Sequence, residues 1–154
     1  AFVLSPNMSI GVNVLFKVVE MVASLLDEAY DAEVVEAHHR MKKDAPSGTA
    51  LALAQAVARG RGVDLADHAR YERYGIIGNR PAGEIGIQTV RAGDIVGEHL
   101  VMFAGGGERL EIIHRAHTRE NFARGAVRSA RWLRGRKPGL YAMTDVLGIG
   151  DEGR

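Results

Sequence analysis

The 154-residue sequence contains no cysteine. Disulfide bonds, thiolate catalysis and zinc sites built from cysteine are therefore excluded, and a reducing compartment is compatible with the composition. Long apolar runs are also absent, because charged residues interrupt every hydrophobic stretch, and we expect no membrane-spanning segment. The formal net charge is only +1, so the chain has no overall field that would attract nucleic acid or a membrane surface.

The length and composition are those of one globular domain. The residues are 46% hydrophobic and 25% charged, which is enough apolar surface to bury a core. The sequence opens with Ala-Phe-Val-Leu-Ser-Pro-Asn, which has neither an initiator methionine nor the basic start of a signal peptide. We therefore interpret the chain as a fragment or a processed piece of a longer protein.

Hydrophobic periodicity divides the chain into helices and strands. Apolar residues recur at helical spacing in four segments, and we expect three long helices and one short helix or turn over residues 9–30, 47–61, 119–133 and 141–147. Extended segments predict strands over residues 32–39, 85–92, 99–104 and 108–114. The glycine-bearing stretch 63–84 is expected to be a loop. This pattern predicts an α+β fold, a four-stranded and mostly antiparallel or mixed sheet covered by helices.

The run from Glu36 to Thr49 carries the strongest chemical signal. It reads Glu-Ala-His-His-Arg-Met-Lys-Lys-Asp-Ala-Pro-Ser-Gly-Thr and combines two adjacent imidazoles, three cations and a helix start. Imidazoles exchange protons near neutral pH, and a helix start with nearby cations binds anions. The combination indicates proton-transfer chemistry on a small acidic substrate.

Geometry limits how these residues can cooperate. Adjacent residues of a strand point to opposite faces, so His38 and His39 cannot face one ligand unless the chain bends. His38 and Lys42 would lie about 13 Å apart in an extended strand, and their cooperation needs a turn, which Asp44-Ala45-Pro46 permits. Two plainer interpretations stay open: one ring of the histidine pair packs in the core, and Ser47 only caps the following helix.

Other motifs are less informative. Glu36 with His38 and His39 lacks the spacing of a metal site, and the neighbouring cations would repel a metal ion, so we expect none. No Gly-x-Gly-x-x-Gly follows an expected strand, so the sequence has no dinucleotide fingerprint. Residues 115–137 hold eight basic residues and one acid, which suggests nucleic acid, but the low net charge favours a solvated or interface face. Arg119, at the start of this helix, can bind a carboxylate bidentately.

Residues 36–50 resemble the signature of the dihydrodipicolinate reductase family, whose members are also called 4-hydroxy-tetrahydrodipicolinate reductases. Residues 5–13, 93–99 and 107–114 and Arg119 are similar to the same family, and the likeness extends over essentially the whole chain to Leu147. The resemblance implies reduction of a cyclic, unsaturated imine dicarboxylate with NADH or NADPH in cytoplasmic lysine and diaminopimelate biosynthesis. It also implies a homotetramer whose subunits pair their sheets, with no nucleic acid or membrane as partner.

The resemblance also implies roles for individual residues. His38 matches the proposed proton donor or acceptor, and Lys42 matches the proposed second proton donor. The positions that match substrate-binding residues are His39, Ser47, Gly48, Thr49 and Arg119. The positions that match the loop at the nicotinamide end of the cofactor are Ser5, Pro6, Asn7 and Met8.

The family's N-terminal half carries the dinucleotide-binding fold, and the glycine fingerprint of that half does not occur in this sequence. We expect residues 1–9 to be the end of a cofactor-domain strand and a hinge loop, and residues 10–135 to be the substrate-binding and oligomerisation domain. Residues 136–154 are expected to pack back on the cofactor domain. The chain alone should bind NAD(P)H poorly and be inactive. Two other functions stay open: a non-catalytic assembly module with the same fold, and a nucleic-acid module that uses residues 115–137.

Overall fold

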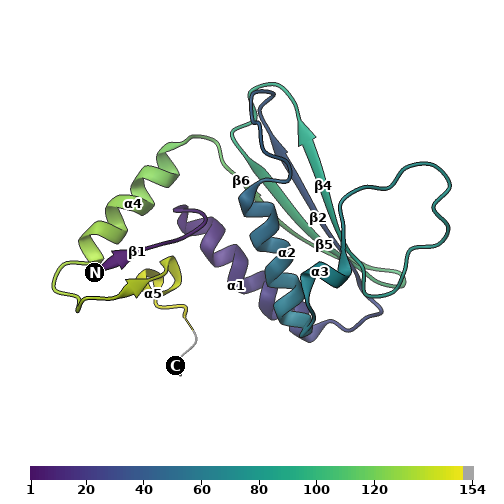
Figure 1. The fold of residues 1–154 in the computed structure, drawn as a ribbon, viewed down its shortest axis with the longest axis horizontal. Coiled ribbons are helices and arrows are strands. Elements are labelled where there is room, and N and C mark those ends of the chain that lie inside the picture. The colour runs from purple at the N-terminus through teal and green to yellow at the C-terminus, as the bar shows by residue number, and fades with distance from the viewer. Residues whose placement is uncertain (151–154) are drawn as a thin grey trace.

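The computed structural model describes residues 1–150 and shows helices packed on one side of a mixed sheet (Figure 1). The elements in chain order are β1 (Phe2–Val3), α1 (Ile10–Leu25), β2 (Asp31–His38), α2 (Gly48–Arg61), α3 (Leu65–His68), β3 (Ala69–Arg70), β4 (Ile85–Arg91), β5 (Glu98–Ala104), β6 (Arg109–Arg115), α4 (Glu120–Trp132), β7 (Leu140–Tyr141) and α5 (Met143–Leu147). Within residues 1–150 no helix is both long enough and apolar enough to cross a bilayer.

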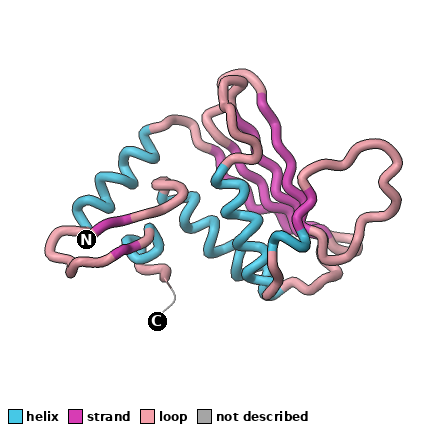
Figure 2. Tube along the Cα trace, viewed as in Figure 1, coloured by secondary structure: helices cyan, strands magenta, loops and turns pink. Residues whose placement is uncertain are grey.

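The main sheet has five strands in the order β3-β4-β2-β5-β6, with β2 at its centre. Figure 2 shows the strands of this sheet in magenta, beside the helices in cyan. β2 runs parallel to β4 and antiparallel to β5. The parallel pair arises because the chain leaves β2, forms α2 and returns to begin β4 at the same end of the sheet. The expected α+β class is confirmed, but the sheet has five strands rather than four. The additional strand, β3, has two residues, too few to show an alternating pattern.

The core lies between the sheet and the helices α1 and α2. Alternate residues of the strands are buried, so Val34 of β2 and Val101 and Phe103 of β5 pack against the helices. Gly60 of α2 allows the two helices to approach closely, since a Cβ there would clash with the backbone carbonyl oxygen of Glu20 in α1. This contact fixes α2, and with it the N-terminal end of α2, relative to the sheet.

Most element boundaries differ from their expected positions by at most two residues, but α1 ends at Leu25 rather than at Tyr30. Asp27 accepts a hydrogen bond from the backbone N–H of Ala29 at 2.9 Å. Such a local side-chain turn competes with continuation of a helix, and periodicity alone does not reveal it.

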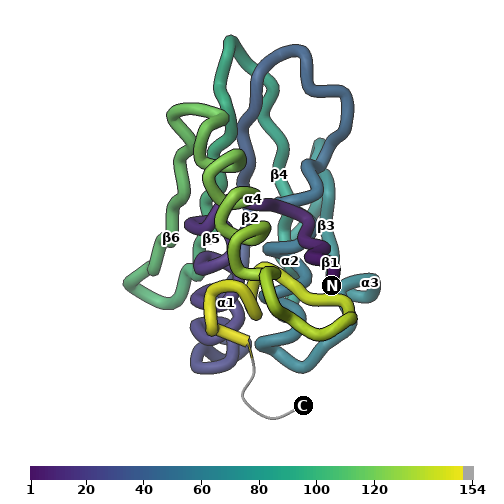
Figure 3. Tube along the Cα trace, turned by 90° about the vertical axis from the view of Figure 1, so that its left-hand side faces the viewer, coloured from purple at the N-terminus to yellow at the C-terminus, as the bar shows by residue number. Residues whose placement is uncertain are grey.

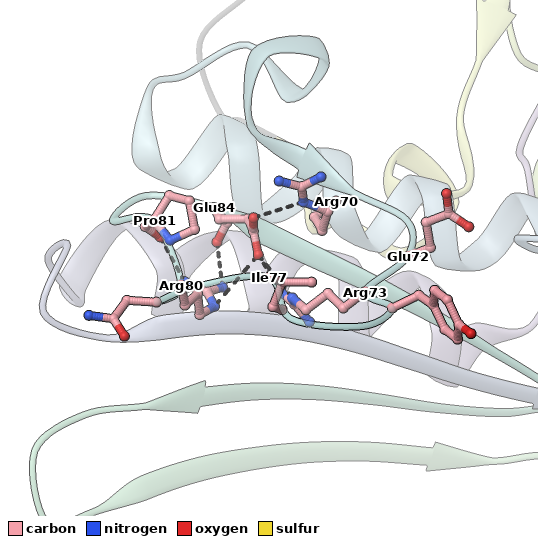
Figure 4. Close-up of a pocket in the computed structure, with 9 residues that line it drawn as sticks. Arg70, Glu72, Arg73, Ile77, Arg80, Pro81 and Glu84 are labelled. Carbon is pink, nitrogen blue, oxygen red and sulfur yellow. Dashed lines mark hydrogen bonds and ion pairs between the residues drawn. The ribbon is translucent and has the colours of Figure 1, made fainter.

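Residues 63–84, expected to be a loop, include α3 and β3, and ion pairs hold the remainder at its base (Figure 4). The guanidinium of Arg73 lies 2.6 Å from Glu33 and 2.5 Å from Glu84, while Arg80 lies 2.6 Å from Asp31 and 3.2 Å from Glu33. Burial alone would raise the pKa of Glu84, but the arginines around it lower this pKa. The carboxylates at the base of this stretch therefore each form an ion pair with an arginine.

The segments near the two ends of the described chain meet on the side of α1 that faces away from the sheet, nearest the viewer in Figure 3. β1 pairs in parallel with β7, with Phe2 opposite Leu140, and α4 and α5 pack near α1. The short helix expected near residues 141–147 is present as α5. The roles expected for residues 1–9 and 136–154 stay predictions, and residues 151–154 lie outside the described part of the chain.

Gly60→Ala should destabilise the protein, although alanine normally favours a helix by about 1 kcal/mol over glycine. The added methyl group would clash with the backbone of Glu20 and the side chain of Ala23. Overpacking of this kind costs about 1–3 kcal/mol. Urea unfolding followed by circular dichroism measures the change in the free energy of unfolding.

Gly48→Ala is the matched control on the same helix, because a Cβ at that position meets nothing within 4 Å. We expect this variant to be as stable as the unmodified chain or slightly more stable. Equal stability of the Gly60 and Gly48 variants would contradict the close contact between α1 and α2.

Candidate functional site

Glu36 lies at the centre of the site and is fully buried near the end of β2. Its carboxylate accepts two hydrogen bonds from Arg91 at 2.8 Å each, one from the backbone N–H of Ser47 at 3.0 Å and one from Thr89 at 3.3 Å. It also lies 2.5 Å from Nδ1 of His38. Burial alone would raise the pKa of Glu36, but the bonds from Arg91, His38 and Ser47 lower it, so the group is ionised.

His38 ends β2 on the same face as Glu36, with 12% of its side chain exposed. Its ring packs edge-on against His99 of β5, with ring centroids 5.3 Å apart. Burial lowers the pKa of His38, the contact with Glu36 opposes this effect, and the charges of Lys42 and Arg91 lower the pKa further. The net direction is downward, which favours the neutral imidazole at neutral pH.

Lys42 reaches the site because the chain turns after β2. The backbone N–H of Lys42 donates to the carbonyl oxygen of His39 at 3.1 Å, and the Nζ atom pairs with Asp44 at 2.9 Å. The Lys42 charge contributes to the lowered pKa of His38, so the two groups lie within electrostatic reach of each other. The turn that their cooperation requires is therefore present.

The start of α2 lies beside this pair. The Ser47 hydroxyl accepts from the backbone N–H of Ala50 at 3.2 Å, which is the capping role, and the side chain is buried. Gly48 is exposed, and Thr49 accepts a hydrogen bond from the amide of Asn7 at 3.0 Å. The open approach to this helix start is therefore over Gly48, while the Ser47 hydroxyl is committed to the cap.

His39 and Arg119 come together although 80 residues separate them. Nη2 of Arg119 lies 3.4 Å from Nε2 of His39. Arg119 is the N-cap residue of α4, and its side chain makes no capping hydrogen bond. His39 is the first residue after β2, and its ring meets the Arg119 guanidinium at this end of the strand.

Residues 5–8 form a loop next to α2. The amide of Asn13 donates to the backbone carbonyl oxygens of Asn7 and Ser9, and the Ser5 hydroxyl donates to the same carbonyl of Asn7 at 2.8 Å. Ser5 and Pro6 line a groove of about 850 Å³ that runs between the loop, α1, α2 and α5, whereas Asn7 and Met8 do not line it. Of the four residues expected near a nicotinamide, the structure places two in a groove.

The described residues do not fit the pyrophosphate of a dinucleotide. None of the connections that lead from a strand to a helix within residues 1–150 contains glycine. A glycine-rich turn at such a connection is what allows the backbone to approach the pyrophosphate. Within residues 1–150 no group of three or more His, Cys, Asp or Glu side chains is arranged so that it could hold a metal ion.

Two residues of the site, Arg91 and His99, were not predicted as site residues from the sequence. Arg91 stands 55 residues from Glu36, and no local pattern links them. His99 lies in the stretch 93–99 that resembles the family, but the sequence assigned it no role in the site. A usable signal was the position of Glu36 in the buried register of β2, because a buried carboxylate requires a cationic or N–H partner.

The family model described as "Dihydrodipicolinate reductase, C-terminus" matches residues 11–147. The chain is 64% identical over 147 residues to the 4-hydroxy-tetrahydrodipicolinate reductase of Syntrophobacter fumaroxidans, and 62% identical to that of Syntrophus aciditrophicus. Each alignment covers 96% of this chain and 55% of the relative, so the chain spans about half the length of the curated relatives it matches.

A solved structure agrees with these matches. Dipicolinate-bound dihydrodipicolinate reductase from Paenisporosarcina sp. TG-14 superimposes with a TM-score of 0.71 at 28% identity, over 93% of this chain and 53% of that one. The fold, the matched family model and the identities agree over the same residues. The chain belongs to the dihydrodipicolinate reductase family, and it corresponds to the C-terminal part of these proteins.

Proposed function

We propose that this chain is the substrate-binding part of a 4-hydroxy-tetrahydrodipicolinate reductase of lysine and diaminopimelate biosynthesis. The observation that carries the proposal is that two groups able to transfer a proton and two groups able to bind an anion lie at the same end of the sheet. His38 and Lys42 are the first pair, and the start of α2 and Arg119 are the second. A cyclic, unsaturated imine with two carboxylates requires both kinds of group.

The two carboxylates would bind at different places. One would lie over Gly48, where the free N–H groups and the dipole of α2 favour an anion and no side chain blocks the approach. The other would bind Arg119, whose guanidinium is held beside His39. The ring between them would then lie close to Lys42 and His38.

Hydride delivery to a ring carbon has to be coupled to a proton at a neighbouring atom. NADH or NADPH would supply the hydride, bound mainly by the part of the relatives that this chain does not match. The ammonium of Lys42, held by Asp44, would donate a proton, and His38 would exchange one. Ser5 and Pro6 would border the nicotinamide end.

We also propose that the chain assembles into a homotetramer through the sheet face that α1 and α2 do not cover. Strand alternation directs Val35, Leu100, Met102 and Ile113 to this face, opposite the buried core positions. Ile113 is 43% exposed. A second copy of the same apolar face is the natural cover for such a surface.

Arg119→Ala should weaken binding of pyridine-2,6-dicarboxylate by about 10- to 100-fold, because a hydrogen bond to a charged group contributes about 1.5–3 kcal/mol. Isothermal titration calorimetry on the chain measures this. Arg128→Ala, an exposed arginine of the same helix, is the control and should bind like the unmodified chain.

A failure to bind needs a second measurement. The chain can be fused behind the N-terminal part of the Syntrophobacter fumaroxidans reductase, which supplies the portion that the chain does not match. If a folded fusion with NADH also fails to bind the dicarboxylate, the proposed substrate class is wrong.

In the same fusion, His38→Gln and Lys42→Gln should each lower kcat by about 10²–10⁴-fold, the usual contribution of a positioned acid or base. Lys43→Gln is the matched control, since its side chain is exposed next to Lys42. Steady-state kinetics with NADH and NADPH separate kcat from KM. Full activity of both variants would favour a non-catalytic assembly module over the proposed role.

Met102→Glu should dissociate the assembly, because an unpaired charge buried in an interface costs about 3 kcal/mol or more, roughly a hundredfold in affinity. Size-exclusion chromatography with light scattering measures the mass. Val127→Glu changes an exposed valine on α4 and is the control. A monomeric unmodified chain at micromolar concentration would contradict assembly through this sheet.

A further inference from the structure

We propose that Glu36 and Arg91 are positioning residues for His38: they hold its ring so that Nδ1 is committed and Nε2 is the nitrogen that exchanges the proton. The inference deepens the proposed function and rests on it, because it takes His38 as a group that handles a proton. The two residues act through His38 and need no contact with the substrate.

The first step concerns Nδ1 of His38. It lies 2.5 Å from Oε2 of Glu36, and an ionised carboxylate can only accept hydrogen bonds. The proton of the neutral ring therefore sits on Nδ1, and Nε2 carries the lone pair. Because Glu36 is fully buried and held by three other donors, it cannot turn away and release the ring.

The second step concerns the room around Nε2. A Cβ at Gly97 would stand 3.0 Å from Nε2 of His38 and 3.4 Å from the neighbouring ring carbon. Any larger residue at the entry to β5 would press on this nitrogen. The glycine thus allows the ring orientation that Glu36 selects.

The third step concerns the charge of Glu36. A buried carboxylate beside an imidazole would by itself retain a proton on the ring as an imidazolium. Arg91 neutralises it with a bidentate pair at 2.8 Å per bond, and its Nη2 is anchored to the carbonyl oxygen of Asp44 at 2.6 Å. Glu36 therefore orients His38 without fixing its charge.

Two further charged or titratable groups face His38, Lys42 on the following loop and His99 on β5. Lys42 lowers the pKa of His38, as does burial, while Glu36 raises it. Arg91 directly contacts Glu36. Its removal therefore tests most directly how these opposing charges set the pKa of His38.

The test is a pH titration of the ¹⁵N-histidine-labelled 154-residue chain by long-range ¹H–¹⁵N NMR. This spectrum distinguishes the two neutral tautomers and gives the pKa of each ring. In the unmodified chain His38 should be protonated on Nδ1 and should have a pKa below its ordinary value. A His38 protonated on Nε2 would overturn the proposal without any variant.

Arg91→Gln should raise the pKa of His38 by about one pH unit or more, the scale of one nearby charge. Glu36→Gln should lower it relative to the unmodified chain. Arg115→Gln is the control, because Arg115 lies at the same end of the sheet, exposed, and pairs with Glu98 rather than Glu36. A merely structural role for Arg91 would change the stability and leave the His38 titration where it was.

A folded Arg91→Gln chain with an unchanged His38 pKa would overturn the proposal. If that variant does not fold, Arg91→Lys replaces it, and the proposal then requires a smaller upward change, since lysine keeps the charge but can form only one of the two bonds. The NMR result does not depend on dicarboxylate binding. A failed titration with pyridine-2,6-dicarboxylate would therefore count against the proposed function, and a failed His38 titration against this inference.

Discussion

A carboxylate that is completely buried in a sheet must be matched by donors, and Glu36 imposes this requirement on the functional end of the molecule. Its partners come from β4, from the start of α2 and from β2 itself. For these hydrogen bonds to Glu36 to form, β2 and β4 must end, and α2 must begin, at the residues where they do. The cap of α2, the end of β4 and the orientation of His38 are therefore coupled through one side chain.

The parallel pairing of β2 and β4 makes this match possible. In its register His38 lies opposite Arg91, and Glu36 lies opposite Thr89. The Arg91 side chain therefore has to extend along the sheet by only two residue positions to bind Glu36. An antiparallel neighbour with the same end residues would place them at opposite ends of the pair.

The sequence predicted local features well, because they follow from periodicity and capping. The helices, the longer strands and the turn after His38 fall where the residues indicate. Arg119 was expected as a carboxylate-binding residue, but its contact with His39 and the pairing of Arg91 with Glu36 could not be predicted. Both arise only through the topology of the sheet and the return of α4. The alternation that buries Glu36 was visible, and it indicated that a partner existed without indicating which residue it was.

The central strand β2 contributes side chains to both faces of the sheet. β2 directs Glu36 and His38 to the side covered by the helices, and Val35 and Ala37 to the uncovered side. A shift of register by one residue would exchange the two sets, so the buried position of Glu36 and the apolar residues of the uncovered face both depend on the register of this strand. The core contacts of Ala32 and Val34 hold that register in place.

His99 shows what the site requires of the surrounding core. It is 4% exposed, it lies between His38 and His114, and neither of its ring nitrogens has a hydrogen-bond partner within residues 1–150. Burial, with smaller effects from His38 and His114, lowers its pKa to about 4. At neutral pH the ring is therefore uncharged, and it covers His38 without repelling a proton there.

The unfolded chain binds a proton at His99 near pH 6.5, whereas the folded chain does so only near pH 4, so acidification through this window favours unfolding. A neutral imidazole at this position thus covers His38 without adding charge beside it, and it lowers the stability of the fold in mild acid.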